Sequence, residues 1–220
     1  AVMTGVSYMV PFVAAGGLLL ALGFLVGGYQ IGEQVNGIDP WKQFVTEYSL
    51  TNLPPTTVDF DGKEVAFAYP AFALYLGSVL FATGQAAMGF VVAALSGYIS
   101  YAMAGRPGIA PGFVGGAISV TLGAGFIGGL VTGLLSGAVA MWLGNQKVPK
   151  VLQSLMPVVI IPLGTSLVVG LVMFLLLGRP LAAILSGLQN WLTSMSGSSA
   201  LLLGVILGLM MCFDLGGPVN

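Results

Sequence analysis

Long apolar segments separated by short polar stretches dominate the pattern along this chain. A helix of roughly 20 apolar residues crosses the hydrocarbon core of a bilayer, and several segments approach or exceed that length. The predicted segments are Val6–Tyr29, Ala68–Ala82, Ala86–Ala104, Gly123–Gly144, Val151–Gly178 and a last one that begins at Leu201. The pattern predicts an all-α polytopic membrane protein with about six hydrophobic segments.

Two places in this pattern predict breaks in the helices. The uncharged stretch from Val65 to Ala104 is too long for one straight span, and the polar Thr83-Gly84-Gln85 is expected to divide it. Its first part is short for a full crossing. The following stretch, RPGIAPG from Arg106 to Gly112, holds two prolines and two glycines, which predict an interruption rather than a continuing helix.

Glycine and proline also mark the fourth and fifth segments. Four glycines recur at every fourth position and so share one helix face: Gly125, Gly129, Gly133 and Gly137. A face without side chains favours close helix packing, although a glycine-lined permeation path remains an alternative. In the fifth segment, two prolines (Pro157 and Pro162) are expected to bend the first half.

After Arg179-Pro180 the pattern changes to that of an amphipathic helix. Leucine, isoleucine and methionine fall on one face between Leu181 and Met195, and serine, threonine, glutamine and asparagine fall on the other. Such a helix is typical of the membrane interface, with Trp191 at headgroup level. A surface helix packed between domains is the alternative interpretation.

The charged residues indicate an orientation in the membrane. Six of the seven acids, with two lysines, lie between Gln30 and Glu64, whereas the loop Asn145–Lys150 carries two lysines and no acid. Lys and Arg are enriched in cytoplasmic loops. We therefore predict that the N-terminus and the lysine loop are cytoplasmic and that the acidic loop is external.

Composition narrows the possible functions. The chain is 57% hydrophobic and only 6% charged, with a net charge of −1, which favours a membrane protein and argues against nucleic acid as a partner. It contains no histidine and one cysteine. Histidine-based catalysis, a disulfide framework and a metal cluster are therefore excluded within this sequence, and no cofactor is predicted.

The last segment carries the candidate binding residues. Asp214 is the only acid within a strongly apolar segment, and an ionised group at bilayer depth costs roughly 2.5–3.5 kcal/mol. The predicted binding residues for a hydroxyl-rich solute are Asp214, Gly216, Gly217, Pro218 and Asn220. Equally open is a simple helix end at the interface, with the carboxylate of Asp214 in water.

Several of these stretches resemble one known family. They run in the order GVSYMVPFVAAGGLLLALGFLVGG (from Gly5), GYISYAMAGRPGIAPGFVGG (from Gly97), GFIGG (from Gly125), MPVVIIPL (from Met156), WLTSMSG (from Trp191) and FDLGGPVN (from Phe213). The combination resembles enzyme IIC, the membrane component of the bacterial phosphoenolpyruvate-dependent sugar phosphotransferase system, in its fructose branch. RPGIAPGF and FDxGGPVN are its most specific motifs.

The resemblance implies a function that spacing alone does not. Such proteins carry a sugar, here fructose or a related hexose, across the bacterial inner membrane while the partner enzyme IIB phosphorylates it from a phosphocysteine. It also implies a homodimer surrounded by lipid. The implied division is a scaffold that mediates dimerisation (1–178), a connector helix (179–199) and the start of the sugar-binding domain (200–220).

The sequence also departs from the family pattern. A lysine normally follows FDxGGPVN and a glutamate comes in a later segment, and neither is present here. Gly105 stands where an acid is expected before RPG. The chain is therefore interpreted as an N-terminal fragment with part of a sugar site. The alternatives are an ion-coupled transporter or channel, and a membrane scaffold without transport activity.

Overall fold

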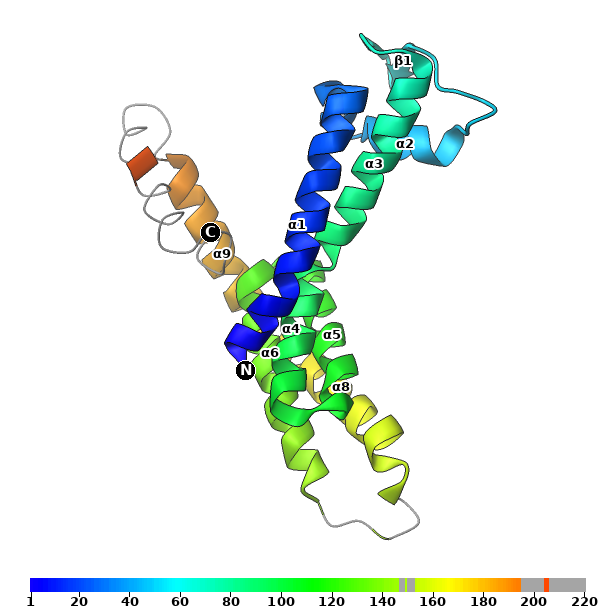
Figure 1. The fold of residues 1–220 in the computed structure, drawn as a ribbon. Coiled ribbons are helices and arrows are strands. Elements are labelled where there is room, and N and C mark those ends of the chain that lie inside the picture. The colour runs from blue at the N-terminus through cyan, green and yellow to red at the C-terminus, as the bar shows by residue number, and fades with distance from the viewer. Residues whose placement is uncertain (147–148, 150–152, 195–203, 206–220) are drawn as a thin grey trace. The chain divides into compact units, whose positions relative to one another are not determined.

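The computed structural model describes residues 1–146, 149, 153–194 and 204–205, and within these ranges the chain is mainly helical (Figure 1). The elements in order are α1 (Val2–Gly27), η1 (Tyr29–Gly32), α2 (Pro40–Glu47), β1 (Thr57–Phe60), β2 (Lys63–Ala66), α3 (Ala71–Gly89), α4 (Val91–Ala104), α5 (Arg106–Thr121), α6 (Gly125–Gly144), η2 (Met156–Ile160), α8 (Ile161–Val172), η3 (Met173–Leu177) and α9 (Gly178–Ser194).

Helices long and apolar enough to cross a membrane confirm the predicted fold class. Among the described residues there are four such stretches: Val2–Gly27, Ala71–Ala104, Gly125–Gly144 and Met156–Trp191. The predicted last segment, from Leu201, lies outside the described residues except for positions 204 and 205. The chain is therefore an all-α polytopic membrane protein.

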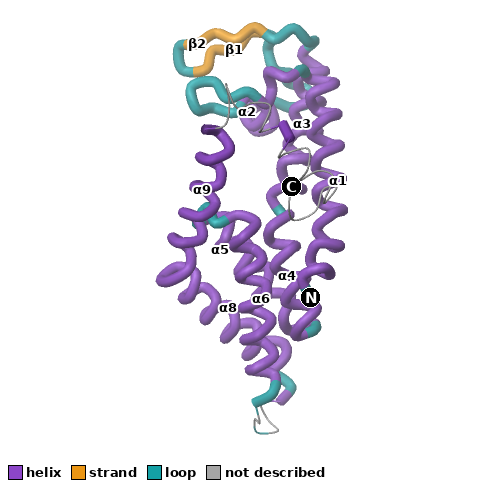
Figure 2. Tube along the Cα trace, turned by 90° about the vertical axis from the view of Figure 1, so that its left-hand side faces the viewer, coloured by secondary structure: helices purple, strands orange, loops and turns teal. Residues whose placement is uncertain are grey.

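The chain divides into two compact units, one formed by Pro11–Phe90 and the other by Ala1–Val10 with the residues from Val91 onward. In the first unit, α1 and α3 lie side by side (Figures 1 and 2). A Cβ atom added to Gly77 of α3 would lie 2.5 Å from both the Cα and the N of Gly27 on α1. Glycine is required at Gly77 because the two backbones are in contact.

The acid-rich stretch after α1 is a small folded cap, not the loop that its polarity predicted. Here α2 lies close to the antiparallel β1–β2 hairpin (Figure 2), and the side chains of this stretch form a core that includes Phe44, Phe60 and Phe67. The hairpin turns at Asp61 and Gly62, both with positive φ (49° and 83°), and the Gly62 N–H donates to Oδ1 of Asp59 at 2.8 Å. In β1, Val58 and Phe60 are buried and Thr57 and Asp59 are exposed. The polar residues of the strand therefore lie on its outer face.

The break between the second and third predicted segments falls at Phe90, not at Thr83–Gln85. The hydroxyl of Thr83 donates to the carbonyl of Val79 at 2.8 Å, so this polar side chain is satisfied within α3. A Cβ on Gly84 would lie 2.8 Å from the backbone N of Leu20. The polar Thr83-Gly84-Gln85 stretch thus lies inside α3. Its glycine does not break the helix, because Gly84 allows α1 to pack closely against α3.

The predicted interruption at RPGIAPG is also wrong, since α5 begins there. Gly105 supplies the turn with φ 70°, and Pro107 occupies the first helical turn, where its missing N–H is not needed. Pro111 lies inside the helix. Gly108, Gly112 and other small residues of α5 face α4, and this close contact holds the helix despite Pro111.

Three of the four glycines predicted to share a packing face on α6 do pack against α4. Gly125 differs, because it has a φ of 48° and a Cβ on it would lie 2.8 Å from Cδ2 of Leu185 on α9. A Cβ on Gly129 would lie 2.7 Å from Val92, one on Gly133 would lie 2.9 Å from the carbonyl oxygen of Ser96, and one on Gly137 would lie 2.7 Å from Met103. All three glycines are buried against α4. This contact leaves no room for a permeation path along them.

The fifth segment contains two π-helical turns, η2 and η3, on either side of α8. Pro157 lies in η2 and Pro162 at the start of α8, so both prolines fall at or next to a π-helical turn, and the bend itself stays a prediction. The following helix, α9, confirms the amphipathic helix as far as Ser194. Its position at a membrane interface stays a prediction.

Candidate functional site

The residues predicted to bind a solute lie outside the part of the chain that the structure describes. These are Asp214, Gly216, Gly217, Pro218 and Asn220. Their role stays a prediction from sequence. The described residues instead contain a group of buried hydroxyls and a cavity.

A group of buried hydroxyls lies where α4, α5 and α6 pack together. Oγ1 of Thr132 donates to the carbonyl of Gly128 at 2.8 Å and lies 3.0 Å from Oγ of Ser96 and 3.3 Å from Oγ of Ser119. Because Thr132 gives its proton to its own helix, it is the acceptor for Ser96. The hydroxyl of Ser119 donates to the carbonyl of Gly115 at 2.9 Å, so the Ser96–Thr132 bond joins α4 to α6, and Ser119 of α5 only packs beside Thr132. The protons of these three hydroxyls are bonded within the protein, as a membrane interior requires.

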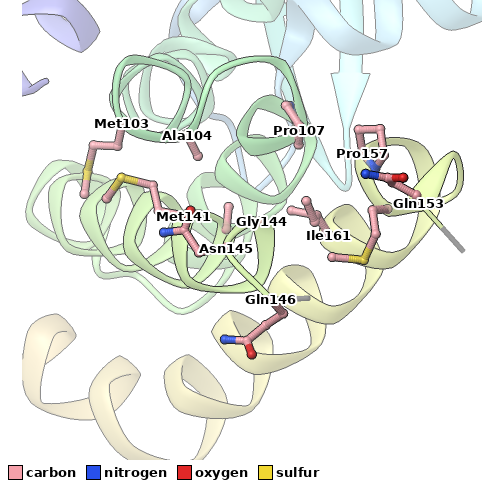
Figure 3. A pocket seen from close by; sticks show the side chains of 12 residues that line it. Met103, Ala104, Pro107, Met141, Gly144, Asn145, Gln146, Gln153, Pro157 and Ile161 are labelled. Atoms are coloured by element: carbon pink, nitrogen blue, oxygen red, sulfur yellow. The ribbon is translucent and has the colours of Figure 1, made fainter. Parts of the chain in front are cut away.

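A cavity of about 750 Å³ lies where α4, α5 and α6 meet the start of the fifth segment. Figure 3 shows Met103, Met141 and Asn145 on one side of it and Gln153 and Ile161 on the other. The complete lining is Met103, Ala104, Pro107, Ala140, Met141, Gly144, Asn145, Gln146, Gln153, Met156, Pro157 and Ile161.

The lining of this cavity combines carboxamides with thioether and proline surfaces. Asn145 and Gln153 are exposed, and Nε2 of Gln146 already donates to the carbonyl of Trp142 at 3.2 Å. None of the lining side chains ionises. The cavity can therefore bind a ligand through hydrogen bonds and apolar contacts, and its lining among the described residues contains no acid, base or nucleophile for catalysis.

This cavity was not predicted from the sequence. Its carboxamides come from both sides of the Asn145–Lys150 loop, and nothing in their spacing brings them together. A signal was present in the prolines, because Pro107 and Pro157 both line the cavity.

Charged side chains of the described residues gather mainly in the cap. There, a hollow of about 380 Å³ beside α2 is lined partly by Asp39, Lys42 and Glu47. Gln43 donates from Nε2 to Oε2 of Glu47 at 2.9 Å. Within the described ranges, no three His, Cys, Asp or Glu side chains are close enough to share a metal ion.

Comparison with protein families gives a match over nearly the whole chain. Residues 3–220 match the family described as "Phosphotransferase system, EIIC". No solved structure matches.

Three similar relatives indicate the branch of that family. The chain is 36% identical to the "PTS system fructose-specific EIIC component" of Haloferax volcanii, with 99% of this chain and 54% of the relative covered. It is 35% identical to the "Fructose-like permease IIC component 2" of Escherichia coli (99% and 51%). It is 41% identical to the "PTS system fructose-specific EIIB'BC component" of Xanthomonas campestris (99% and 32%). The chain spans about half the length, or less, of these relatives.

Proposed function

Because this chain belongs to the EIIC family of the phosphotransferase system, we propose that it takes part in sugar uptake across the inner (plasma) membrane, with the sugar phosphorylated as it enters. Fructose or a related hexose is the proposed sugar. The observation that carries this proposal is the identity of 35–41% to relatives named for fructose, over 99% of the chain.

The phosphoryl donor in this proposal is an enzyme IIB domain. Relatives named as EIIABC and EIIB'BC components combine the IIB and IIC parts in one protein, which supports this choice of donor. In the described residues of this chain the cavity lining has no nucleophile. Phosphorylation is therefore assigned to the partner, and binding and translocation to the permease.

The proposed division of labour follows the predicted boundaries. Residues 1–178 form the scaffold and the homodimer contact. Residues 179–199 form a helix that connects the scaffold to the sugar-binding domain, which begins with residues 200–220. The glycine-mediated contacts among α4, α5 and α6 support a rigid scaffold. Asp214, the GGPV backbone and Asn220 are proposed to hydrogen-bond sugar hydroxyls, for which carboxylate, amide and backbone groups are suited.

The central test is uptake of radiolabelled fructose by right-side-out vesicles that contain the full-length protein. We expect uptake only when phosphoenolpyruvate, the general phosphotransferases and IIB are all present, and the product inside should be a sugar phosphate. Uptake without IIB, or uptake driven by an ion gradient and yielding free sugar, would contradict the proposal.

The proposed orientation places the N-terminus in the cytoplasm and the cap outside. All acidic side chains of the described residues belong to the cap, while Lys147 and Lys150 follow α6 in the sequence, in agreement with the enrichment of Lys and Arg in cytoplasmic loops.

Labelling of single cysteines tests this orientation. In a background with Cys212→Ser, we expect a membrane-impermeant maleimide to label Thr51→Cys in intact cells, because Thr51 is exposed in the cap. Gln146→Cys, exposed at the end of α6, should be labelled only after the membrane is permeabilised. Labelling of both positions from the same side would exclude the proposed topology.

A further inference from the structure

The first two membrane stretches differ in length more than one bilayer accommodates. Val2–Gly27 has 26 residues, and Ala71–Ala104, which continues from α3 into α4, has 34. At 1.5 Å per residue they are roughly 39 and 51 Å long, against a hydrocarbon core of about 30 Å. A tilt of about 40°, the upper end of the usual range, brings only the shorter stretch down to that thickness. Part of the longer stretch therefore lies outside the hydrocarbon.

The contacts between α1 and α3 show which part this is. Gly27, the last residue of α1, is level with Gly77 of α3, because a Cβ on Gly77 would lie 2.5 Å from the backbone N of Gly27. Gly23 is likewise level with Phe81, since a Cβ on Gly23 would lie 2.9 Å from the backbone N of Phe81. The first turns of α3, residues 71–76, therefore extend beyond the end of α1.

The short helix α2 lies beside α3 at the level of the last turn of α1. The ring of Trp41 is 5.7 Å from the ring of Phe81, measured between centroids, and the ring of Phe81 is 4.9 Å from that of Phe24 on α1. Figures 1 and 2 both show the β1–β2 hairpin near the beginning of α3 and α2 farther along that helix. The cap thus covers the part of α3 that extends beyond α1.

The outward face of α2 is too polar for hydrocarbon. Lys42 and Glu47 are exposed, and together with Asp39 they line the hollow of about 380 Å³ beside this helix. The apolar side is already used, because Phe44 is fully buried and Trp41 packs against the core of the cap. Ionised groups are costly within a bilayer, and the irregular chain that follows Glu47 is not tolerated in contact with lipid tails. Water or lipid headgroups must therefore reach α2.

We propose that, on the side of the cap, the hydrocarbon of the bilayer begins between Gly77 and Phe81 of α3. The polar face of α2 then contacts the lipid headgroups, and the first two turns of α3 stand outside the hydrocarbon. Hydropathy alone indicates a different boundary, near Ala68, where the apolar sequence begins. The inference requires a membrane location only. It depends neither on the sugar nor on which side of the membrane the cap lies.

This boundary removes the difference in length between the two stretches. Val2–Gly23 and Phe81–Ala104 have about 22 and 24 residues, roughly 33 and 36 Å, and both cross the core at a modest tilt. The boundary also places two exposed tyrosines, Tyr29 and Tyr69, at headgroup level. A Cβ on Gly28 would lie 2.6 Å from Cε2 of Tyr69, so this ring lies at the end of α1. Tyrosine is enriched at the interface between membrane and water.

Site-directed spin labelling of the full-length protein in phosphatidylcholine liposomes, without other cysteines, tests the boundary. Single cysteines replace Phe72 and, about four turns or roughly 21 Å further along the same face of α3, Ala86. Both residues are exposed, so the labels leave the core intact. We expect the label at Phe72→Cys to collide mainly with a water-soluble nickel chelate, and the label at Ala86→Cys mainly with oxygen, which concentrates in hydrocarbon. Collisions of both labels mainly with oxygen, or of both mainly with nickel, overturn the proposal.

Fluorescence quenching in the same liposomes tests the contact of α2 with headgroups. A bimane label on Thr46→Cys, at an exposed position of α2, should be quenched severalfold more by a lipid with a nitroxide on its headgroup than by one with a nitroxide deep in its acyl chain. The matched control Glu64→Cys, at an exposed position of the hairpin, should be quenched by iodide and not by the headgroup nitroxide. Quenching of Thr46→Cys by iodide alone, or chiefly by the deep nitroxide, would contradict the headgroup contact. These measurements use neither sugar nor IIB, so a negative uptake experiment leaves them unaffected.

Discussion

Replacing Gly112 with leucine should prevent the scaffold from folding. A Cβ at this position would lie 2.7 Å from the Cα of Gly97, 2.7 Å from the Cβ of Ser100 and 2.8 Å from the carbonyl oxygen of Ser96. These atoms belong to the backbone of α4 or are fixed to it, so no side-chain rotation relieves the overlap. The two helices must separate, and the buried hydroxyl contacts of Ser96 are then lost as well.

The size of the effect follows from the cost of overpacking. Extra methylene groups in a well-packed interior cost about 1–3 kcal/mol, and more where only backbone can yield. Gly112→Ala should therefore lower the melting temperature by several degrees, at about 2–4 °C per kcal/mol for a chain of this size. Gly112→Leu should give no monodisperse protein in detergent.

The matched control for Gly112 lies on the same helix. Ala110 is exposed on α5, so Ala110→Leu adds the same kind of side chain without a contact to α4. Its melting temperature should stay close to that of the unaltered protein, as measured by differential scanning fluorimetry in one detergent. Native melting of Gly112→Leu would show that α4 and α5 are not packed as described.

Prediction from sequence succeeded where one local pattern fixes the structure. Hydrophobic length predicted the membrane helices, and the spacing of four between Gly129, Gly133 and Gly137 predicted the face that packs. The structure that each pattern predicts depends only on one helix and the helix packed against it. They need no knowledge of distant contacts.

Prediction failed where tertiary contacts override a local preference. Gly108, Gly112 and Gly116 have the same spacing as the glycines of α6, but the prolines among them outweighed that signal and predicted a break. Pro111 is tolerated because close contact with α4 compensates for the lost helical bond. Likewise, Phe44 and Phe60 are fully buried in the cap, although the acids around them indicated an open loop.

The two candidate binding sites, the stretch around Asp214 and the cavity at the end of α6, also differ in whether the sequence predicts them. Asp214 was predicted as a binding residue because a single carboxylate within an apolar segment can be recognised from the sequence alone. The cavity was not predicted, because Asn145 and Gln153 are ordinary polar residues until the chain folds back and brings them to opposite sides of it. These two residues are candidates for ligand binding because they lie on the same cavity, and not because of their residue type.

In the full-length protein, Asp214→Asn should weaken sugar binding by about tenfold or more. Sugar hydroxyls donate to a carboxylate in charge-assisted bonds of roughly 1.5–3 kcal/mol each, and each 1.4 kcal/mol corresponds to a tenfold change in affinity. Asparagine has nearly the same shape but no charge, so expression and oligomeric mass should change little. The measurement is the dissociation constant for fructose by isothermal titration calorimetry in detergent.

A competing role for Asp214 is to accept hydrogen bonds from the free N–H groups of the GGPV stretch that follows it. In that case Asp214→Asn should lower the melting temperature first and leave the affinity for fructose unchanged. Asp61→Asn is the matched control, because Asp61 is an exposed acid of the cap whose positive φ of 49° asparagine tolerates. It should alter neither quantity. Native affinity together with reduced stability in Asp214→Asn would remove Asp214 from the sugar site and leave it a capping residue.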